Sequence, residues 1–125
     1  MQFASVRLVT RDVDRLAAFY RLITSVEPER PAPQFANFSF GSVALAISAE
    51  TVIQQFNAGA AIAAANRSAI IEFQVDDVDA FHARLPVEID VAMQPATMPW
   101  GNRSMLLRDP DGNVVNIFAP PAARG

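Results

Sequence analysis

The sequence predicts an α+β protein built from two βαβββ modules. Apolar and polar residues alternate over several short segments, which is the pattern of half-buried strands. Two other segments carry apolar residues at helical spacing, and each begins directly after an aspartate. The second half of the chain also repeats the first, because residues 71–79 align with residues 6–14 at an offset of 65 and both segments contain Asp-Val-Asp.

The first module opens with a strand and a helix. Residues 5–10 alternate, so Val6 and Leu8 share one face of the strand while Arg7 lies on the other. Asp12 is the expected N-cap of a helix over residues 13–23, because its side chain can accept a hydrogen bond from the first helical turn.

A hairpin and a linker follow the first helix. Prolines between residues 28 and 33 predict an irregular sheet edge. Residues 35–40 and 43–47 alternate on either side of a Gly-Ser pair and predict a hairpin. Residues 49–66 are rich in alanine and carry one charge, so we expect a loose helix over residues 51–56 and then a small-residue linker.

The second module is expected to follow the same order. Its predicted elements are a strand over residues 71–75, a helix over 78–85, a short strand over 87–91, and hairpin strands over 101–107 and 113–118. Asp109-Pro110-Asp111-Gly112 joins the last two strands, with proline and glycine where a type I turn favours them. The predicted organisation is one domain with a first module over residues 1–48, a linker over 49–66 and a second module over 67–121.

Composition excludes several kinds of function. The chain is 51% hydrophobic and 18% charged, which is typical of a folded domain with a core. It has no cysteine, one histidine, ten arginines and no lysine. This excludes disulfides, thiolate metal sites, sites with two or more histidines within one chain, and lysine Schiff bases. The net charge of −3 and the lack of a basic stripe argue against nucleic acid. We expect no membrane span and no signal peptide, and therefore a cytoplasmic protein.

Particular motifs in both modules resemble those of a known superfamily. The first module has Asp12-Val13-Asp14 ahead of Phe19-Tyr20, and the second has Pro99-Trp100-Gly101 ahead of Arg108-Asp109-Pro110-Asp111-Gly112-Asn113. With the repeat, these motifs resemble the vicinal oxygen chelate superfamily of glyoxalases, bleomycin-resistance proteins and extradiol dioxygenases over nearly the whole chain. The resemblance implies a cupped mixed sheet around a central cavity, with helices outside and often a homodimer. It also implies metal ligands on the first and last strand of each module.

The metal ligands implied by the resemblance are missing from this sequence. The four positions fall on Ser5, Ala46, Ile70 and Asn116. None of these side chains is a thiolate, an imidazole or a carboxylate, and a divalent cation needs such donors to offset its dehydration. A register slip of one residue would place only apolar residues there. We therefore expect no metal and no cofactor.

Two charged residues are the first candidates for contact with a ligand. Arg7 and Glu72 are equivalent in the repeat and lie on the strand face of the missing ligands. A charge there is rarely fully buried unless it is paired. One interpretation is that one or both bind a polar group of a ligand, and the other is an Arg–Glu pair between the modules or exposure at the cavity mouth. Glu72 is the one catalytic candidate, because an unpaired carboxyl group can act as an acid or base.

Six further residues complete the predicted ligand-binding set. They are Trp100, Asn102, Ser104, Asn116, Phe38 and Phe118. The tryptophan ring can either wall a ligand cavity or anchor its loop against the sheet rim. The three neutral polar residues suit hydrogen bonding better than proton transfer. The phenylalanines of the strands are too many for one core face, so we expect some to line an apolar pocket.

Four other side chains receive mainly structural interpretations. Tyr20 is expected in the core, at the end of the first helix. His82 is expected on the outer side of its helix, because Val78 is on the buried stripe. Arg103 and Arg108 on the last hairpin either hold an anion or lie at a solvated edge.

Three functions remain open at this stage. The first is a metal-free protein that binds a small apolar or aromatic ligand, in the manner implied by the bleomycin-resistance branch. The second is an enzyme of glyoxalase, isomerase or dioxygenase type, and the third is a structural or regulatory subunit that only dimerises. The missing ligands and the phenylalanines favour the first, and the net charge of −3 would suit a cationic ligand. The expected partners are therefore a small molecule and a second copy of the chain.

Overall fold

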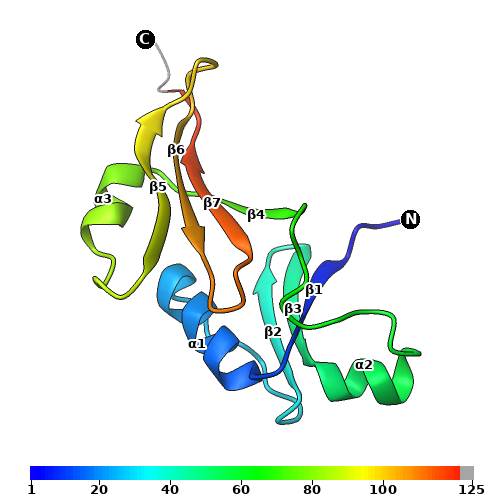
Figure 1. Ribbon diagram of the computed structural model, residues 1–125. Coiled ribbons are helices and arrows are strands. Elements are labelled where there is room, and N and C mark those ends of the chain that lie inside the picture. The colour runs from blue at the N-terminus through cyan, green and yellow to red at the C-terminus, as the bar shows by residue number, and fades with distance from the viewer. Residues whose placement is uncertain (122–125) are drawn as a thin grey trace. The chain divides into compact units, whose positions relative to one another are not determined.

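Residues 1–121 are described by a computed structural model of the chain (Figure 1). The chain divides between Asn66 and Arg67 into two compact units, and each unit has a mixed sheet of its own. The α+β class and the modular pattern are confirmed, because in both units a helix follows the first strand and a hairpin closes the sheet. No helix among residues 1–121 is long and apolar enough to cross a membrane.

The first unit is a three-stranded sheet with two helices. Its elements are β1 (Ser5–Thr10), α1 (Val13–Thr24), β2 (Phe35–Phe40), β3 (Val43–Ala49) and α2 (Glu50–Phe56). Strand β3 is central, parallel to β1 and antiparallel to β2. The proline-rich segment adds only an isolated bridge between Glu29 and Asn37, since a proline has no N–H to donate to a ladder.

Helix α1 forms and packs for local reasons that the sequence shows. The Asp12 carboxylate accepts a hydrogen bond from the Arg15 backbone N–H at 3.0 Å. The helix ends at Ser25, which adopts the left-handed conformation and donates its N–H to the Arg21 carbonyl. Its buried face consists of Val13, Leu16, Ala17, Phe19, Tyr20 and Ile23. Most of the helical residues that are buried in the core of the first unit therefore come from α1.

The second unit is a four-stranded sheet with one short helix. Its elements are β4 (Ile70–Gln74), α3 (Val78–Ala83), β5 (Asp90–Thr97), β6 (Arg103–Arg108) and β7 (Val114–Ala119). The strand order is β4-β7-β6-β5, with β4 and β7 parallel and the other pairs antiparallel. The core face of this sheet carries Met105, Leu107, Val115 and Ile117, which are almost completely buried.

Two predicted boundaries in the second unit are wrong. The helix expected over residues 78–85 ends at Ala83. The strand expected over residues 87–91 begins at Asp90 and continues to Thr97, because the Ile89 N–H bonds the Pro86 carbonyl and keeps residues 86–89 in a turn. Strand β5 contains Pro95, which is tolerated because β5 is an edge strand with register shifts.

The turn between β6 and β7 sets the register of the last hairpin, as the sequence predicts. The Gly112 N–H donates to the Asp109 carbonyl at 2.9 Å, and Gly112 has a φ of +83°. The buried Asp109 carboxylate accepts hydrogen bonds from the backbone N–H groups of Asp111 and Asn113 and from the Asn113 side chain. These contacts fix the turn, and the turn places Leu106 opposite Asn116.

Candidate ligand-binding face of the second sheet

One side of the second sheet gathers several of the predicted site residues. Glu72 pairs with Asn116 across β4 and β7, and Leu106 pairs with Asn116 across β6 and β7. Ser104 pairs with Phe118 one step further along the same strands. Because cross-strand partners and residues two apart share a face, these five residues lie on the side opposite the core face. We call this side of the sheet the Glu72 face.

A hydrogen-bonded network links three polar residues of this face. The Ser104 hydroxyl donates to Asn116 Oδ1 at 2.5 Å, and Asn116 Nδ2 donates to Glu72 Oε2 at 2.8 Å. The three side chains come from three different strands, so only the folded sheet brings them together. Ser104 is buried with 6% exposure, Asn116 is half-buried and Glu72 is exposed. The network therefore runs from the interior of the unit to its surface.

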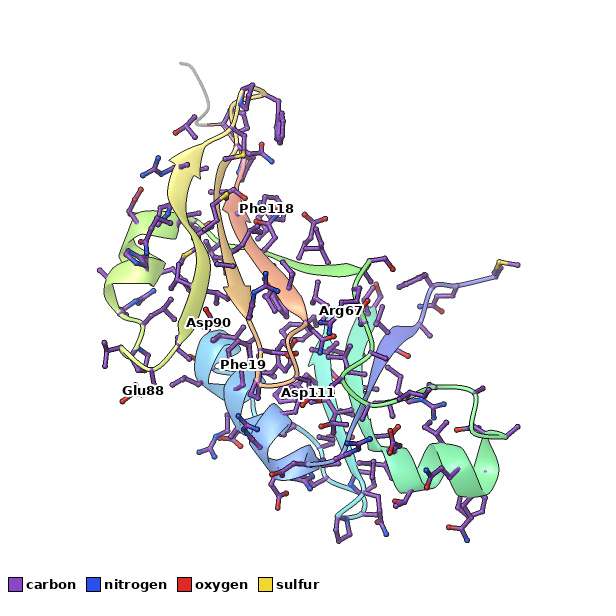
Figure 2. The ribbon with its side chains drawn as sticks, in the orientation of Figure 1. Phe19, Arg67, Glu88, Asp90, Asp111 and Phe118 are labelled. Atoms are coloured by element: carbon purple, nitrogen blue, oxygen red, sulfur yellow. The ribbon has the colours of Figure 1, made fainter. Side chains whose placement is uncertain are left out.

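Apolar side chains accompany the network. Phe118 projects from β7 (Figure 2) and is half-buried, as is Leu106. Leu106 was absent from the predicted set, although its spacing of two from Ser104 on an alternating strand was a usable signal. The face thus offers apolar area beside a small number of polar groups, which is the usual composition of a ligand site.

The loop between β5 and β6 carries the other two predicted residues. The Met98 N–H donates to the Asn102 carbonyl at 2.7 Å, and the Gly101 N–H donates to the Met98 carbonyl at 2.8 Å. Trp100 at the tip of this loop is 70% exposed. The interpretation of Trp100 as a loop anchor is therefore wrong, and the ligand-binding roles of Trp100 and Asn102 stay predictions.

Arg7 lies on β1 of the first unit and has a partner there. It is exposed, and its Nη2 donates to Asn57 Oδ1 at 2.9 Å. Nothing in the linker composition pointed to Asn57, since the segment was expected to consist only of small residues and a loose helix. The register partner of Arg7 is Ala46, the position equivalent to Asn116. The expected pair of Arg7 with Glu72 concerns two separate units and stays a prediction.

Phe38 requires a correction. It is completely buried, and its ring lies edge-on to Tyr20 of α1 at a centroid distance of 6.3 Å. It pairs with the buried Leu45 on the face of the first sheet that packs against α1. Phe38 is thus a core residue and does not line a ligand pocket, because helix α1 covers the face to which it points. The prediction that Tyr20 is a core residue is confirmed by its complete burial.

Arg103 forms an ion pair with the Asp79 carboxylate of the same unit. Its Nε and Nη2 donate to the two oxygens of Asp79 on α3 at 3.1 and 2.8 Å, and its Nη1 donates to Thr97 Oγ1 at 3.3 Å. The guanidinium group lowers the pKa of the Asp79 carboxyl group, and the carboxylate raises the pKa of Arg103. This pair ties the helix of the second unit to its sheet.

The comparisons with known proteins identify the class. The model of the glyoxalase-like domain family matches residues 3–120, and the chain therefore belongs to that family. This membership confirms the predicted resemblance to the vicinal oxygen chelate superfamily. Comparison with curated proteins gives no significant match.

Solved structures with the same fold are similar to this chain over most of its length. A glyoxalase-related enzyme from Fulvimarina pelagi has a TM-score of 0.82 and 21% identity, covering 95% of this chain and 88% of that chain. A glyoxalase/bleomycin resistance protein/dioxygenase family enzyme from Burkholderia phytofirmans has a TM-score of 0.79 and 19% identity, covering 95% and 98%. A lactoylglutathione lyase from Agrobacterium tumefaciens has a TM-score of 0.74 and 27% identity, covering 94% and 92%.

The residues present do not fit the divalent metal that the superfamily implies. Ala46 and Ile70 carry no donor atom, and the Asn116 amide already bonds Ser104 through its oxygen and Glu72 through its nitrogen. Over residues 1–121, no three histidine, aspartate or glutamate side chains are grouped so that they could hold a metal ion. The side chains at the family positions therefore do not supply the donor set that a metal-assisted reaction needs.

Proposed function

We propose that this chain is a metal-free protein that binds a small apolar or aromatic molecule, with the Glu72 face as part of its binding site. The observation that supports the proposal is the network of Ser104, Asn116 and Glu72 beside Phe118 and Leu106. Apolar and aromatic area supplies most of the affinity of such a site, and a few oriented polar groups supply its selectivity. The donor-poor family positions favour binding over metal-assisted catalysis.

A panel of small aromatic and apolar compounds tests the binding role. A bound compound stabilises the folded chain by RT ln(1 + [L]/Kd), about 2.7 kcal/mol at one hundred times Kd. We expect some compounds to raise the melting temperature and to lose this effect in Phe118→Ala. Phe56→Ala is the matched control, because Phe56 is 71% exposed on α2 of the other unit. A panel without a single hit, or equal losses in the two variants, would count against the proposal.

Metal analysis tests the metal-free part separately. We expect the purified chain to hold no stoichiometric zinc, iron, nickel or manganese, and Asn116→Ala to leave its metal content unchanged. Stoichiometric metal that disappears in Asn116→Ala would contradict the proposal.

The alternative function is an enzyme of glyoxalase, isomerase or dioxygenase type that uses Glu72 as an acid or base. The 27% identity to a lactoylglutathione lyase favours keeping this candidate. Glu72 is exposed and accepts a hydrogen bond from Asn116 through one carboxylate oxygen, and its second oxygen has no hydrogen-bond partner among residues 67–121. The test is turnover of lactoylglutathione, which we expect to be absent; activity that falls sharply in Glu72→Gln would support the enzyme instead.

We also propose a homodimer. Strands β1 and β4 each lie at the edge of their sheets, and an edge strand presents unpaired backbone groups that a partner can cover. Light scattering of the purified chain measures the mass directly. A mass corresponding to one chain across the working concentration range would overturn this part of the proposal.

A further inference from the structure

The direction of the hydrogen bonds on the Glu72 face has a consequence for the ligand. A carboxylate only accepts hydrogen bonds, so Asn116 must turn its Nδ2 toward Glu72, as the 2.8 Å contact shows. The Asn116 oxygen then faces Ser104, and the Ser104 hydroxyl has to donate to it. The bonds thus run in one direction, from Ser104 through Asn116 to the carboxylate of Glu72.

Hydrogen bonds in this direction use hydrogens of Ser104 and Asn116 as donors, and they leave oxygen lone pairs for a ligand. Among residues 67–121, no group donates a hydrogen bond to the second oxygen of Glu72, and the Ser104 hydroxyl already donates its hydrogen to Asn116. The remaining donor of the network is the second N–H of Asn116. The face therefore presents mainly hydrogen-bond acceptors, and one of them is charged.

The charges of the same face do not cancel this negative group. Among residues 67–121 Glu72 forms no ion pair. Arg103 points to the other side of the sheet, where it is paired with Asp79. The one arginine that shares the face by strand register is Arg108, which lies beside Val114 and opposite the acidic Asp90. The row of Glu72 and Asn116 lies next to Phe118. Among residues 67–121, no ion pair compensates the negative charge of the Glu72 carboxylate in this row.

We infer that the ligand carries a cationic group rich in N–H donors, such as an ammonium, amidinium or guanidinium, on an aromatic or apolar body. The cationic group binds the free oxygen of Glu72, and the body packs against Phe118 and Leu106. Ser104 and Asn116 are positioning residues, because they hold the carboxylate in one orientation. An anionic ligand would place acceptors against acceptors and a negative charge against Glu72. This inference rests on the binding role proposed above.

Three compounds of matched shape test the inference: benzamidine as the cation, benzamide as the neutral analogue and benzoate as the anion. Titrations followed by NMR of the full chain measure all three dissociation constants. We expect benzamidine to bind at least about tenfold more tightly than benzamide, with benzoate weakest, and the preference to weaken as salt is added.

Variants separate the Glu72 carboxylate from the overall charge of the chain. Glu72→Gln should make the affinities for benzamidine and benzamide nearly equal. Glu88→Gln is the control, because it removes the same charge from the exposed turn before β5 (Figure 2) and should preserve the preference. Ser104→Ala should weaken benzamidine severalfold and shift the side-chain amide signals of Asn116, which is a signature that a general packing defect elsewhere would not produce.

The outcomes distinguish this inference from the binding role itself. If benzamide or benzoate binds as tightly as benzamidine, or if Glu72→Gln keeps the preference, the inference is overturned while the binding role stands. If none of the three compounds binds, the inference is also overturned, and the broader compound panel decides the binding role alone.

Discussion

The two units repeat a backbone arrangement but differ in the side chains at its equivalent positions. In the first unit the row across the sheet is Arg7, Ala46 and Asn37, and in the second it is Glu72, Asn116 and Leu106. The central side chain decides the difference. The methyl group of Ala46 cannot form a hydrogen bond, so Arg7 bonds Asn57, whereas the Asn116 amide links two neighbouring strands. The internal repeat thus creates equivalent positions in the two sheets. Whether a hydrogen-bonded network forms there depends on one residue, Ala46 or Asn116.

The units also differ in how they bury apolar groups. Helix α1 has twelve residues and buries six of them, while α3 has six residues and buries only Val78. The aromatic core of the first unit joins Tyr20 of α1 to Phe38 of β2, whereas Phe118 of the second unit lies half-exposed on the Glu72 face. Helix α1 of the first unit therefore covers an aromatic pair on its sheet, whereas Phe118 on the Glu72 face of the second unit is only half-buried.

The largest expected effect is on the free energy of unfolding, when one phenylalanine of each unit is replaced by alanine. Phe38→Ala removes a completely buried ring and should lower the free energy of unfolding by about 3–5 kcal/mol. Phe118→Ala removes a half-buried ring and should cost less than half as much. Chemical denaturation of both variants measures the difference. Equal costs would show that Phe118 is as much a core residue as Phe38.

The next effect concerns the central position of each row. Asn116→Ala leaves the buried Ser104 hydroxyl without its acceptor and should cost about 1–3 kcal/mol of stability. Ala46→Asn introduces the same amide in the first unit, where Arg7 offers no acceptor, and should change stability by less than about 0.5 kcal/mol. Denaturation curves check both values. A stabilising Ala46→Asn would contradict the view that the network needs its neighbours.

A smaller effect on stability comes from backbone strain after α2, in residues 57–66 at the end of the first unit. Ala58 and Ala64 both have a φ of 57°, where the second unit's hairpin uses Gly112. Because a side chain is disfavoured in this conformation, Ala58→Gly should stabilise the protein by about 0.5–1 kcal/mol. Ala60→Gly is the control and should be neutral or destabilising, since Ala60 does not have a positive φ. Thermal and chemical denaturation should agree in sign for both variants.

The smallest effect is a pH dependence that each unit contributes through one carboxyl group. The Ala63 backbone N–H lowers the pKa of Glu50, and the Arg103 guanidinium lowers that of Asp79. A pKa that is lower in the folded state stabilises the fold at neutral pH, and this stabilisation is lost as the pH falls below about 4. Melting temperatures should therefore decline less steeply with acid in Glu50→Gln and Asp79→Asn than in the parent chain.

Salt separates the two contributions. Added salt should weaken the Asp79 contribution, because it depends on an exposed ion pair, more than the Glu50 contribution, whose main cause is a backbone hydrogen bond. If neither substitution changes how the melting temperature declines at low pH, the stabilising roles of both Glu50 and Asp79 are contradicted.

Much of this architecture follows from local patterns in the sequence. Asp12 predicts the start of α1 and caps it in the structure, and Asp77 of the repeated segment caps α3 in the same way. The Asp-Pro-Asp-Gly segment predicts the last turn and hence the pairing of β6 with β7. The start of β5 was misplaced because the hydrogen bond from the Ile89 N–H to the Pro86 carbonyl keeps residues 86–89 in a turn, which the apolar pattern does not show.

The candidate site could be predicted only as a set of residues. The alternation of each strand assigns Ser104, Asn116 and Glu72 to faces, but it does not say which face a helix covers. For this reason Phe38 was expected in a pocket, whereas α1 packs over it. The preference of Arg7 for Asn57 was equally hidden, because these residues are far apart in the chain and meet only after folding.

The sequence by itself determined the order of the elements, the internal repeat and the loss of metal-ligating side chains, because these depend on residue type and spacing alone. The tertiary structure decided which of the polar residues meet. A hydrogen bond between side chains needs its two atoms within about 3 Å, and strand register sets that distance across the sheet. Register between β4, β7 and β6 is what joins Glu72, Asn116 and Ser104 into one network.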